Sequence, residues 1–233
     1  MPATLLQLRT DLRAKLDEQT DVGAPMGRVW LDPDLNRWIN EGLRDVARRT
    51  ETLLTFYTAI TVVPGMQKTP VPSNVIRLHR VEFQPTGSSQ IYPIAASTYQ
   101  EMDQYWGVYP QQQRSYPYYY ILWGFPPNLT MQLYPVPSQG GVLNLFYYRL
   151  PAPLLADTDV AEIPEGWHDL VVLYAEYTAR RKDRDQSWQD PKQLYEASLS
   201  EMIDRTRQWH DQARTIFVGT NAVPEWLYGG SEW

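Results

Sequence analysis

The sequence contains no cysteine, and this absence excludes disulfide bonds, thiolate catalysis and zinc sites with cysteine ligands. It also lacks any run approaching the roughly 20 apolar residues of a membrane-spanning helix. Near the N-terminus, Arg9, Asp11, Arg13 and Lys15 interrupt the leucines that a secretory signal would need. The sequence therefore predicts neither a membrane span nor a signal peptide, and we expect folding in the cytosol.

Positive charge is outnumbered by negative charge. The net charge is −6, whereas a protein that grips nucleic acid through its phosphates needs a concentrated basic surface. Between residues 81 and 148 the only cation is Arg114, and the only acids are Glu82, Glu101 and Asp103. The composition thus disfavours phosphate-directed nucleic-acid binding and marks a nearly uncharged middle segment.

Aromatic residues are abundant. The 233 residues include 9 Trp and 16 Tyr, which is high for a folded soluble protein. A chain of this length forms one large domain or a domain with an inserted lobe. So much aromatic surface must be covered by a core or by partners.

Helical periodicity marks both ends of the chain. Residues 4–19 predict an amphipathic helix with a Thr4/Gln7 capping box, and Asp32-Pro33 predicts an N-cap followed by proline at the first helical position. Pro164 and Asp190-Pro191 predict the starts of two further helices, which the short link makes antiparallel neighbours. The residues expected in the core of this bundle are Leu35, Trp38, Ile39, Leu43, Val171, Tyr174, Leu199 and Met202.

The middle of the chain has strand periodicity, because from residue 54 apolar residues alternate with a period of two. Strands are expected at residues 54–62, 75–83, 91–95, 118–123, 129–134 and 142–149. A short helix is expected near residues 98–105, and residues 138–141 are expected to connect a hairpin.

These patterns predict an α+β fold in three parts. Residues 1–52 and 160–216 are expected to form a helical bundle from the N- and C-terminal helices. Residues 53–159 are expected to form an inserted antiparallel β-sandwich or barrel lobe. Residues 217–233, in which helical periodicity fails, are expected to form an extended C-terminal arm for docking.

Two Trp-His-Asp tripeptides are the main candidates for a metal site. Antiparallel packing could bring His168 and Asp169 close to His210 and Asp211. We favour the interpretation that these residues complement helix ends or lie at the surface, and His79 offers even less. We expect no metal and no cofactor.

No catalytic set is recognisable. The carboxylate pairs Asp183/Asp185 and Asp32/Asp34 lie at predicted helix ends, where capping and solvation explain them. Serine nucleophiles lack an elbow motif, and no phosphate-binding glycine loop is present. We therefore expect the protein not to be an enzyme.

An aromatic segment occupies residues 105–125. A platform for stacking sugars is one interpretation, whereas single-stranded nucleic acid would need more cations than Arg114. A subunit or tail interface explains the segment better, because interface cores are rich in aromatics and poor in charge. The residues predicted for it are Tyr105, Trp106, Tyr109, Tyr118, Tyr119, Tyr120 and Trp123.

Four stretches together resemble the head-to-tail adaptor (connector) proteins of tailed bacteriophages. They span most of residues 30–185 and read DPDLNRWINEGLRDVARR, VPSNVIRLHRVEF, LYPVPSQGGVLNLFYYRLPAPL and IPEGWHDLVVLYAEYTARRKDRD. The chain departs from the smaller, nearly all-helical adaptors in its β insertion and is more similar to the longer ones.

The resemblance implies a non-enzymatic ring, expected to contain twelve copies, in the virion neck after assembly in the host cytoplasm. Its partners would be the portal protein and the tail or nozzle/terminator proteins, with double-stranded DNA passing through the lumen without specific binding. The anchors expected to reach the portal are Phe217, Trp226, Tyr228 and Trp233. The alternative is a carbohydrate- or receptor-binding virion module that uses the aromatic segment, and an enzyme comes third.

Overall fold

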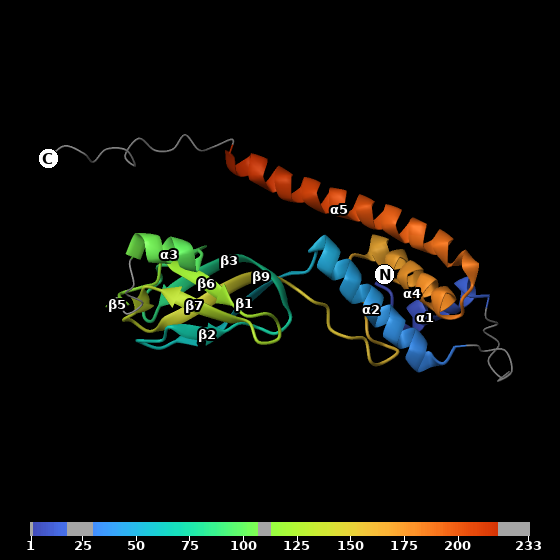
Figure 1. Cartoon of the computed structure of the whole chain (residues 1–233), viewed down its shortest axis with the longest axis horizontal. Coiled ribbons are helices and arrows are strands. Elements are labelled where there is room, and N and C mark those ends of the chain that lie inside the picture. The colour runs from blue at the N-terminus through green and yellow to red at the C-terminus, as the bar shows by residue number, and fades with distance from the viewer. Residues whose placement is uncertain (1, 18–29, 107–112, 219–233) are drawn as a thin grey trace. The chain divides into compact units, whose positions relative to one another are not determined.

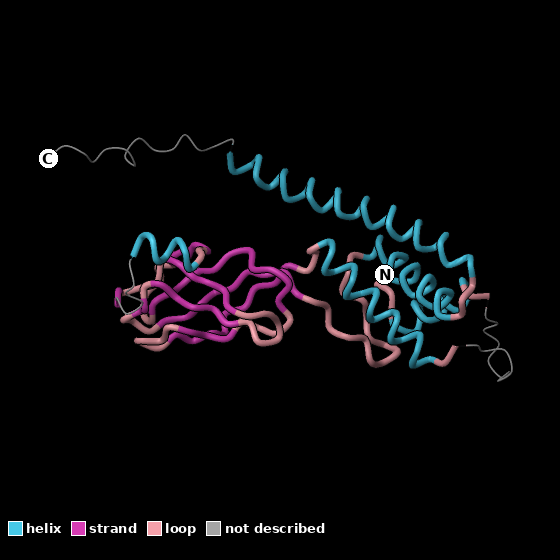
Figure 2. Tube along the Cα trace, in the orientation of Figure 1, coloured by secondary structure: helices cyan, strands magenta, loops and turns pink. Residues whose placement is uncertain are grey.

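The computed structural model describes residues 2–17, 30–106 and 113–218. It is a mixed α+β structure with helices at both ends of the chain and a curled, half-barrel sheet from its middle (Figures 1 and 2). The described residues form two compact units, of which the β-rich unit comprises Leu43–Leu154 and Ala161–Ile163. The α+β class is confirmed, whereas the helical bundle and the β-sandwich or barrel are not.

Four α-helices account for most of the helical part of the chain. They are α1 (Leu5–Lys15), α2 (Asp32–Thr50), α4 (His168–Lys182) and α5 (Gln189–Val218), with 3₁₀ turns at Glu165–Trp167 and Gln186–Trp188. Both α1 and α5 pack against α4. A Cβ at Gly42 would come 3.1 Å from the Tyr174 side chain. The lack of a side chain at Gly42 thus lets the α2 backbone approach α4 closely.

The start of α1 has the predicted capping box. Thr4 Oγ1 accepts the N–H of Gln7 at 3.3 Å, and Gln7 Oε1 accepts the N–H of Thr4 at 2.9 Å. The N–H of Leu5 donates to the carbonyl oxygen of Asp159 at 2.9 Å. The segment that follows the β-rich region therefore helps to satisfy the first turn of this helix.

Helix α2 begins one residue earlier than predicted. Asp32 is its first residue and not the N-cap, because the Leu31 carbonyl oxygen accepts the N–H of Leu35 at 3.2 Å. The Asp32 carboxylate binds Arg13 Nη2 at 2.5 Å and lies 3.6 Å from Arg9 Nε. Asp32 thus links α1 to the start of α2.

The sheet contains seven strands in the order β1–β9–β3–β4–β6–β7–β2, and β5 pairs separately with β8. Strand bounds are β1 (Leu54–Val62), β2 (Lys68–Pro70), β3 (Val75–Pro85), β4 (Tyr92–Ala96), β5 (Gln113–Arg114), β6 (Tyr119–Trp123), β7 (Thr130–Tyr134), β8 (Val136–Pro137) and β9 (Gly141–Arg149). The six predicted strands are therefore present, close to their predicted limits.

One pair in this sheet departs from the antiparallel prediction: β4 and β6 are parallel. A parallel pair needs a crossover connection, and α3 (Tyr99–Trp106) lies between these two strands in sequence. Thr98 caps α3, because its Oγ1 accepts the N–H of Glu101 at 3.2 Å. The helix expected near residues 98–105 is therefore part of the crossover connection from β4 to β6, which lets these two strands run parallel.

The prediction of a hairpin connection at residues 138–141 is wrong. This segment leads from β8 into β9, and β9 lies between β1 and β3. A Cβ at Gly141 would overlap the Gln84 carbonyl oxygen and come 2.6 Å from the Phe83 ring. Gly141 is therefore needed for the close approach of β9 to β3, and not for a tight turn.

The two edges of the sheet differ. β1 has nine residues without charge or proline, whereas β2 has three residues that include Lys68 and Pro70. Short strands, lysine and proline are the usual protections of an exposed edge. Only β2 carries them.

The β-rich unit has its own hydrophobic core, which includes Phe83, Met131, Leu133, Leu143 and Leu145. In the helices, the residues predicted for the core are buried, except Tyr174, which is half-buried and packs edge-on against Tyr177 and Tyr195.

Candidate interaction surfaces

The histidine candidates do not gather into a metal site within the part of the chain that the structure describes. His168 is buried, and its Nδ1 accepts the backbone N–H of Ala3 at 3.2 Å. His210 and Asp211 belong to α5, but their side chains lie outside the described set. Among the described side chains, no three His, Asp or Glu lie close enough together to hold a metal ion.

The carboxylate pairs bind the chain's own groups. Asp185 accepts the side-chain O–H and the backbone N–H of Ser187, and these bonds lower its pKa. Asp34 lies 3.2 Å from Arg37 Nη2 and 3.6 Å from Lys182 Nζ. Their contacts are those of capping and ion-pair residues in a stable fold.

The described part of the aromatic segment divides between core and surface. Tyr118 and Tyr119 are half-buried, and Trp123 is 63% exposed. Tyr120 belongs to the core of the β-rich unit, where burial raises the pKa of its hydroxyl group. The remaining predicted positions, Tyr105, Trp106 and Tyr109, have no described side chains.

Trp123 is held in place by a polar and aromatic network. Its ring lies edge-on to Tyr99, with 5.8 Å between centroids. The Tyr99 hydroxyl donates to Gln132 Oε1 at 2.8 Å, and Gln132 Nε2 donates to the Tyr134 hydroxyl at 2.9 Å. Phe125, further along the same connection, is exposed. We call Trp123 and Phe125 the aromatic edge. Trp123 is anchored by Tyr99, and both rings are exposed, so both are accessible to a partner.

A second apolar surface lies on β1, for which the sequence pattern predicts only a strand. The register between β1 and β9 shifts between Tyr57 and Ile60, so one extra residue of β1 is accommodated. Because such a bulge reverses which side chains face the core, Val62 is buried while Leu54 and Phe56 are exposed. The Phe56 ring packs on Phe146 at 4.6 Å. The alternation of apolar residues gave no sign of this surface, because it does not reveal the register shift.

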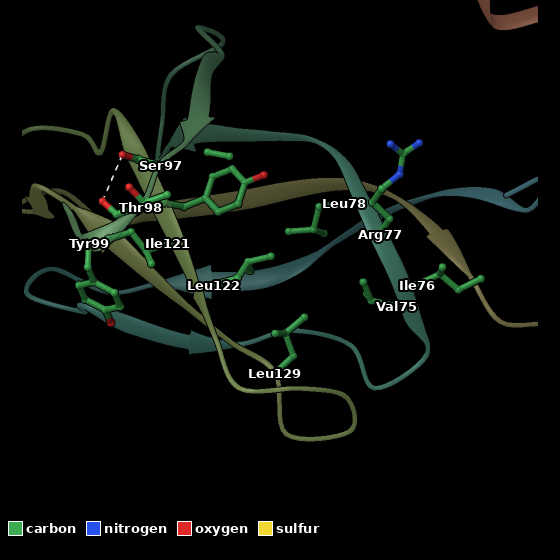
Figure 3. Close-up of a pocket in the computed structure, with 12 residues that line it drawn as sticks. Val75, Ile76, Arg77, Leu78, Ser97, Thr98, Tyr99, Ile121, Leu122 and Leu129 are labelled. Atoms are coloured by element: carbon green, nitrogen blue, oxygen red, sulfur yellow. Dashed lines mark hydrogen bonds between the residues drawn. The ribbon is translucent and has the colours of Figure 1, made fainter. Parts of the chain in front are cut away.

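A pocket of about 460 Å³ opens in the β-rich unit, and sequence patterns gave no signal for it. Side chains of β3 line one side of the pocket, and side chains of β6 and the start of α3 line the other (Figure 3). Its lining residues are Val75, Ile76, Arg77, Leu78, Ala96, Ser97, Thr98, Tyr99, Tyr120, Ile121, Leu122 and Leu129. The lining carries one charged side chain, Arg77, whose guanidinium binds the Glu51 carboxylate at 2.5 Å.

Comparison with known proteins identifies the family. The family model described as SU10 adaptor protein matches residues 3–223, which is nearly the whole chain. The chain belongs to the SU10 adaptor protein family. It is therefore a phage adaptor-type protein and a virion component, and this structural family implies a non-enzymatic role. No curated protein matches this SU10 adaptor.

Membership of the SU10 adaptor family agrees with the character of the described surfaces. They are apolar and aromatic faces suited to other virion proteins, whereas the candidate carboxylates bind nearby serine, arginine and lysine groups. Within the described residues, this SU10 adaptor has no helix long and apolar enough to cross a membrane.

Proposed function

We propose that this chain is a head-to-tail adaptor that forms a ring between portal and tail in the virion neck, with double-stranded DNA passing through the lumen. The observation that carries the proposal is the family match over residues 3–223. A twelve-copy ring is the stoichiometry that the sequence resemblance favours.

The aromatic edge supplies a subunit or tail interface in this proposal. Interface cores are enriched in Trp, Tyr and Phe and depleted in charge. Trp123 is anchored through Tyr99, so little side-chain entropy would be lost when a partner covers it. Tyr118 and Tyr119 are half-buried and remain proposed members of the interface, whereas Tyr120 belongs to the core.

The C-terminal residues supply the portal contact. Phe217 lies in α5, so helical structure continues beyond the point at which the sequence pattern fails. Trp226, Tyr228 and Trp233 lie outside the described residues. They remain the proposed anchors because they are the large aromatic residues of this segment.

Assembly tests the proposal directly. We expect the full-length chain to co-purify with the portal protein and to give rings in negative-stain images. A Trp123→Ala variant should assemble less well, whereas Leu194→Ala, at an exposed residue of α5, should serve as the matched control. A protein that stays monomeric beside its portal, and whose fluorescence shifts on titration with oligosaccharide, would favour the receptor-binding alternative.

A further inference from the structure

Strand β4 ends before its two neighbours do. On one side it pairs with β3, from Val81 to Phe83. On the other side it pairs with β6 at Tyr119 and Tyr120. The neighbours run on: β3 begins at Val75, and β6 continues to Trp123. Beyond β4, these two strands therefore flank a gap in the sheet.

Both sides of this gap are strand edges without a ladder partner in the described part of the chain. Residues 75–80 of β3 pair with β9 on their other side. Residues 121–123 of β6 pair with β7 on their other side. We call the gap the strand slot. The β6 edge presents backbone N–H and C=O groups at regular strand spacing, whereas register shifts at Val75/Arg77 and Leu78/Arg80 interrupt the β3 edge.

The pocket of about 460 Å³ fills the strand slot. Leu78 and Leu122 come from its opposite walls (Figure 3). Leu122 is two residues beyond the core residue Tyr120, so it shares the inward face of β6. It is nevertheless 41% exposed. The slot thus leaves part of the hydrophobic core uncovered.

The residues that follow β4 leave the line of the strand and border the slot as α3 begins. Glu101 Oε2 accepts the backbone N–H of Thr98 at 2.9 Å and the hydroxyl of Ser97 at 2.8 Å. These bonds lower the Glu101 pKa, with the Thr98 N–H as the largest cause. They direct the residues after β4 into α3 and keep the slot open.

We propose that the strand slot binds a short extended segment of another virion protein, which adds as a strand between β3 and β6 and continues the line of β4. An extended polypeptide offers backbone groups to both edges, and its alternate side chains, if apolar, cover Leu78 and Leu122. The pocket volume lies within the roughly 300–1,000 Å³ of ligand sites, which suits a few residues. The source of the segment rests on the proposed adaptor function.

Amide hydrogen exchange on the unmodified protein gives the first test. The full-length chain is compared free and in the purified neck complex. Strand addition should slow exchange in residues 76–78 and 121–123 by about tenfold or more, as for amides that gain ladder hydrogen bonds. If the chain has joined the complex and exchange at these residues is unchanged, the slot proposal is overturned and the adaptor function is not affected. Absence of the chain from the complex overturns the adaptor function, and the virion source of the segment with it.

Crosslinking then identifies the occupant. Because the chain has no cysteine, Leu122→Cys provides a unique thiol for a benzophenone photocrosslinker. Ser89→Cys, at an exposed residue of the same unit, is the matched control. We expect the Leu122 site, and not the control, to link to an apolar segment of another virion protein identified by mass spectrometry. A crosslink to residues 219–233 of this chain overturns the proposed occupant. So does the absence of any crosslink in complexes in which exchange at residues 76–78 and 121–123 is slowed.

Discussion

Arg149 and Glu162 form a two-point ion pair. Arg149 Nη1 donates to Glu162 Oε2 at 2.8 Å, and Nη2 donates to Oε1 at 2.9 Å. The same Oε2 accepts the backbone N–H of Ala152 at 3.0 Å. The pair thus ties the end of β9 to residues 161–163 within the β-rich unit. Bidentate, charge-assisted bonds of this kind are among the stronger polar interactions in proteins.

This ion pair predicts a dependence of stability on pH. The hydrogen bonds from Arg149 lower the Glu162 pKa below its ordinary value of 4.5. A lowered folded-state pKa adds stability above pH 4.5, and this contribution is lost as pH falls through the folded value. Glu162→Gln should cost about 1–2 kcal/mol at pH 7, and the difference from wild type should shrink below pH 4.

Urea unfolding at pH 7, 5 and 3.5 measures this effect. Glu201→Gln is the control, because the Glu201–Arg205 pair lies on the exposed surface of α5, where removal should cost less than about 0.5 kcal/mol. A Glu162→Gln penalty that persists unchanged at pH 3.5 would assign the effect to packing.

Trp38 should be a major contributor to stability. It is 2% exposed, lies edge-on to Trp30 at 5.0 Å, and has Lys182 Nζ 5.2 Å from its ring. Trp38→Ala should cost about 3–5 kcal/mol. Trp123→Ala removes the same side chain from an exposed site and should cost less than about 1 kcal/mol. Equal melting temperatures of the two variants would contradict the placement of Trp38 in the core.

Gly141 should tolerate no side chain. A Cβ there overlaps the Gln84 carbonyl oxygen, so Gly141→Ala must displace β9 from β3 and should cost about 1–3 kcal/mol. At Gly166 nothing lies within 4 Å of the new Cβ, and Gly166→Ala should be nearly neutral. Thermal unfolding of both variants by circular dichroism checks this, and a neutral Gly141→Ala would contradict the close approach.

Removal of residues 219–233 should separate assembly from stability. An arm that orders only on a partner contributes little to the free chain, so Tm should change by no more than about two degrees. Incorporation into portal-containing particles should fail. Unfolding of the truncated chain, or normal incorporation, would refute the arm.

Double-stranded DNA should bind negligibly at physiological salt. Each chain carries −6. The proposed ring would multiply this charge, and a channel for DNA benefits from walls that do not hold phosphates. A mobility-shift assay at 50 and 150 mM salt measures the affinity. Tight, salt-sensitive binding would contradict this prediction and support a nucleic-acid-binding function.

Local patterns were sufficient for much of the fold. The Thr4/Gln7 capping box and the apolar stripe through Trp38 and Ile39 depend on neighbours within a few residues, and the structure has them. Strand β1 has the limits that alternation predicts. Strands β2, β5 and β8 are only two or three residues long, too short for periodicity to register.

Pairing between distant segments could not be predicted in this way. Alternation at residues 54–62 gives no sign of the register shift that exposes Phe56. The glycines near residue 140 resemble a turn, although Gly141 serves contact with Phe83. The strand slot depends on where β4 ends relative to β3 and β6. These features belong to tertiary context, which overrides local preference.

The unequal edges of the sheet disfavour edge-to-edge pairing between copies of this chain. If β1 of one copy could pair with β2 of the next, the contact would be heterologous, and heterologous contacts that do not close produce open filaments. Pro70 removes a backbone donor from β2, and Lys68 adds a charge that pairing would desolvate. These two residues disfavour pairing at the β2 edge, so β1 can stay unprotected without the sheet growing into a fibre.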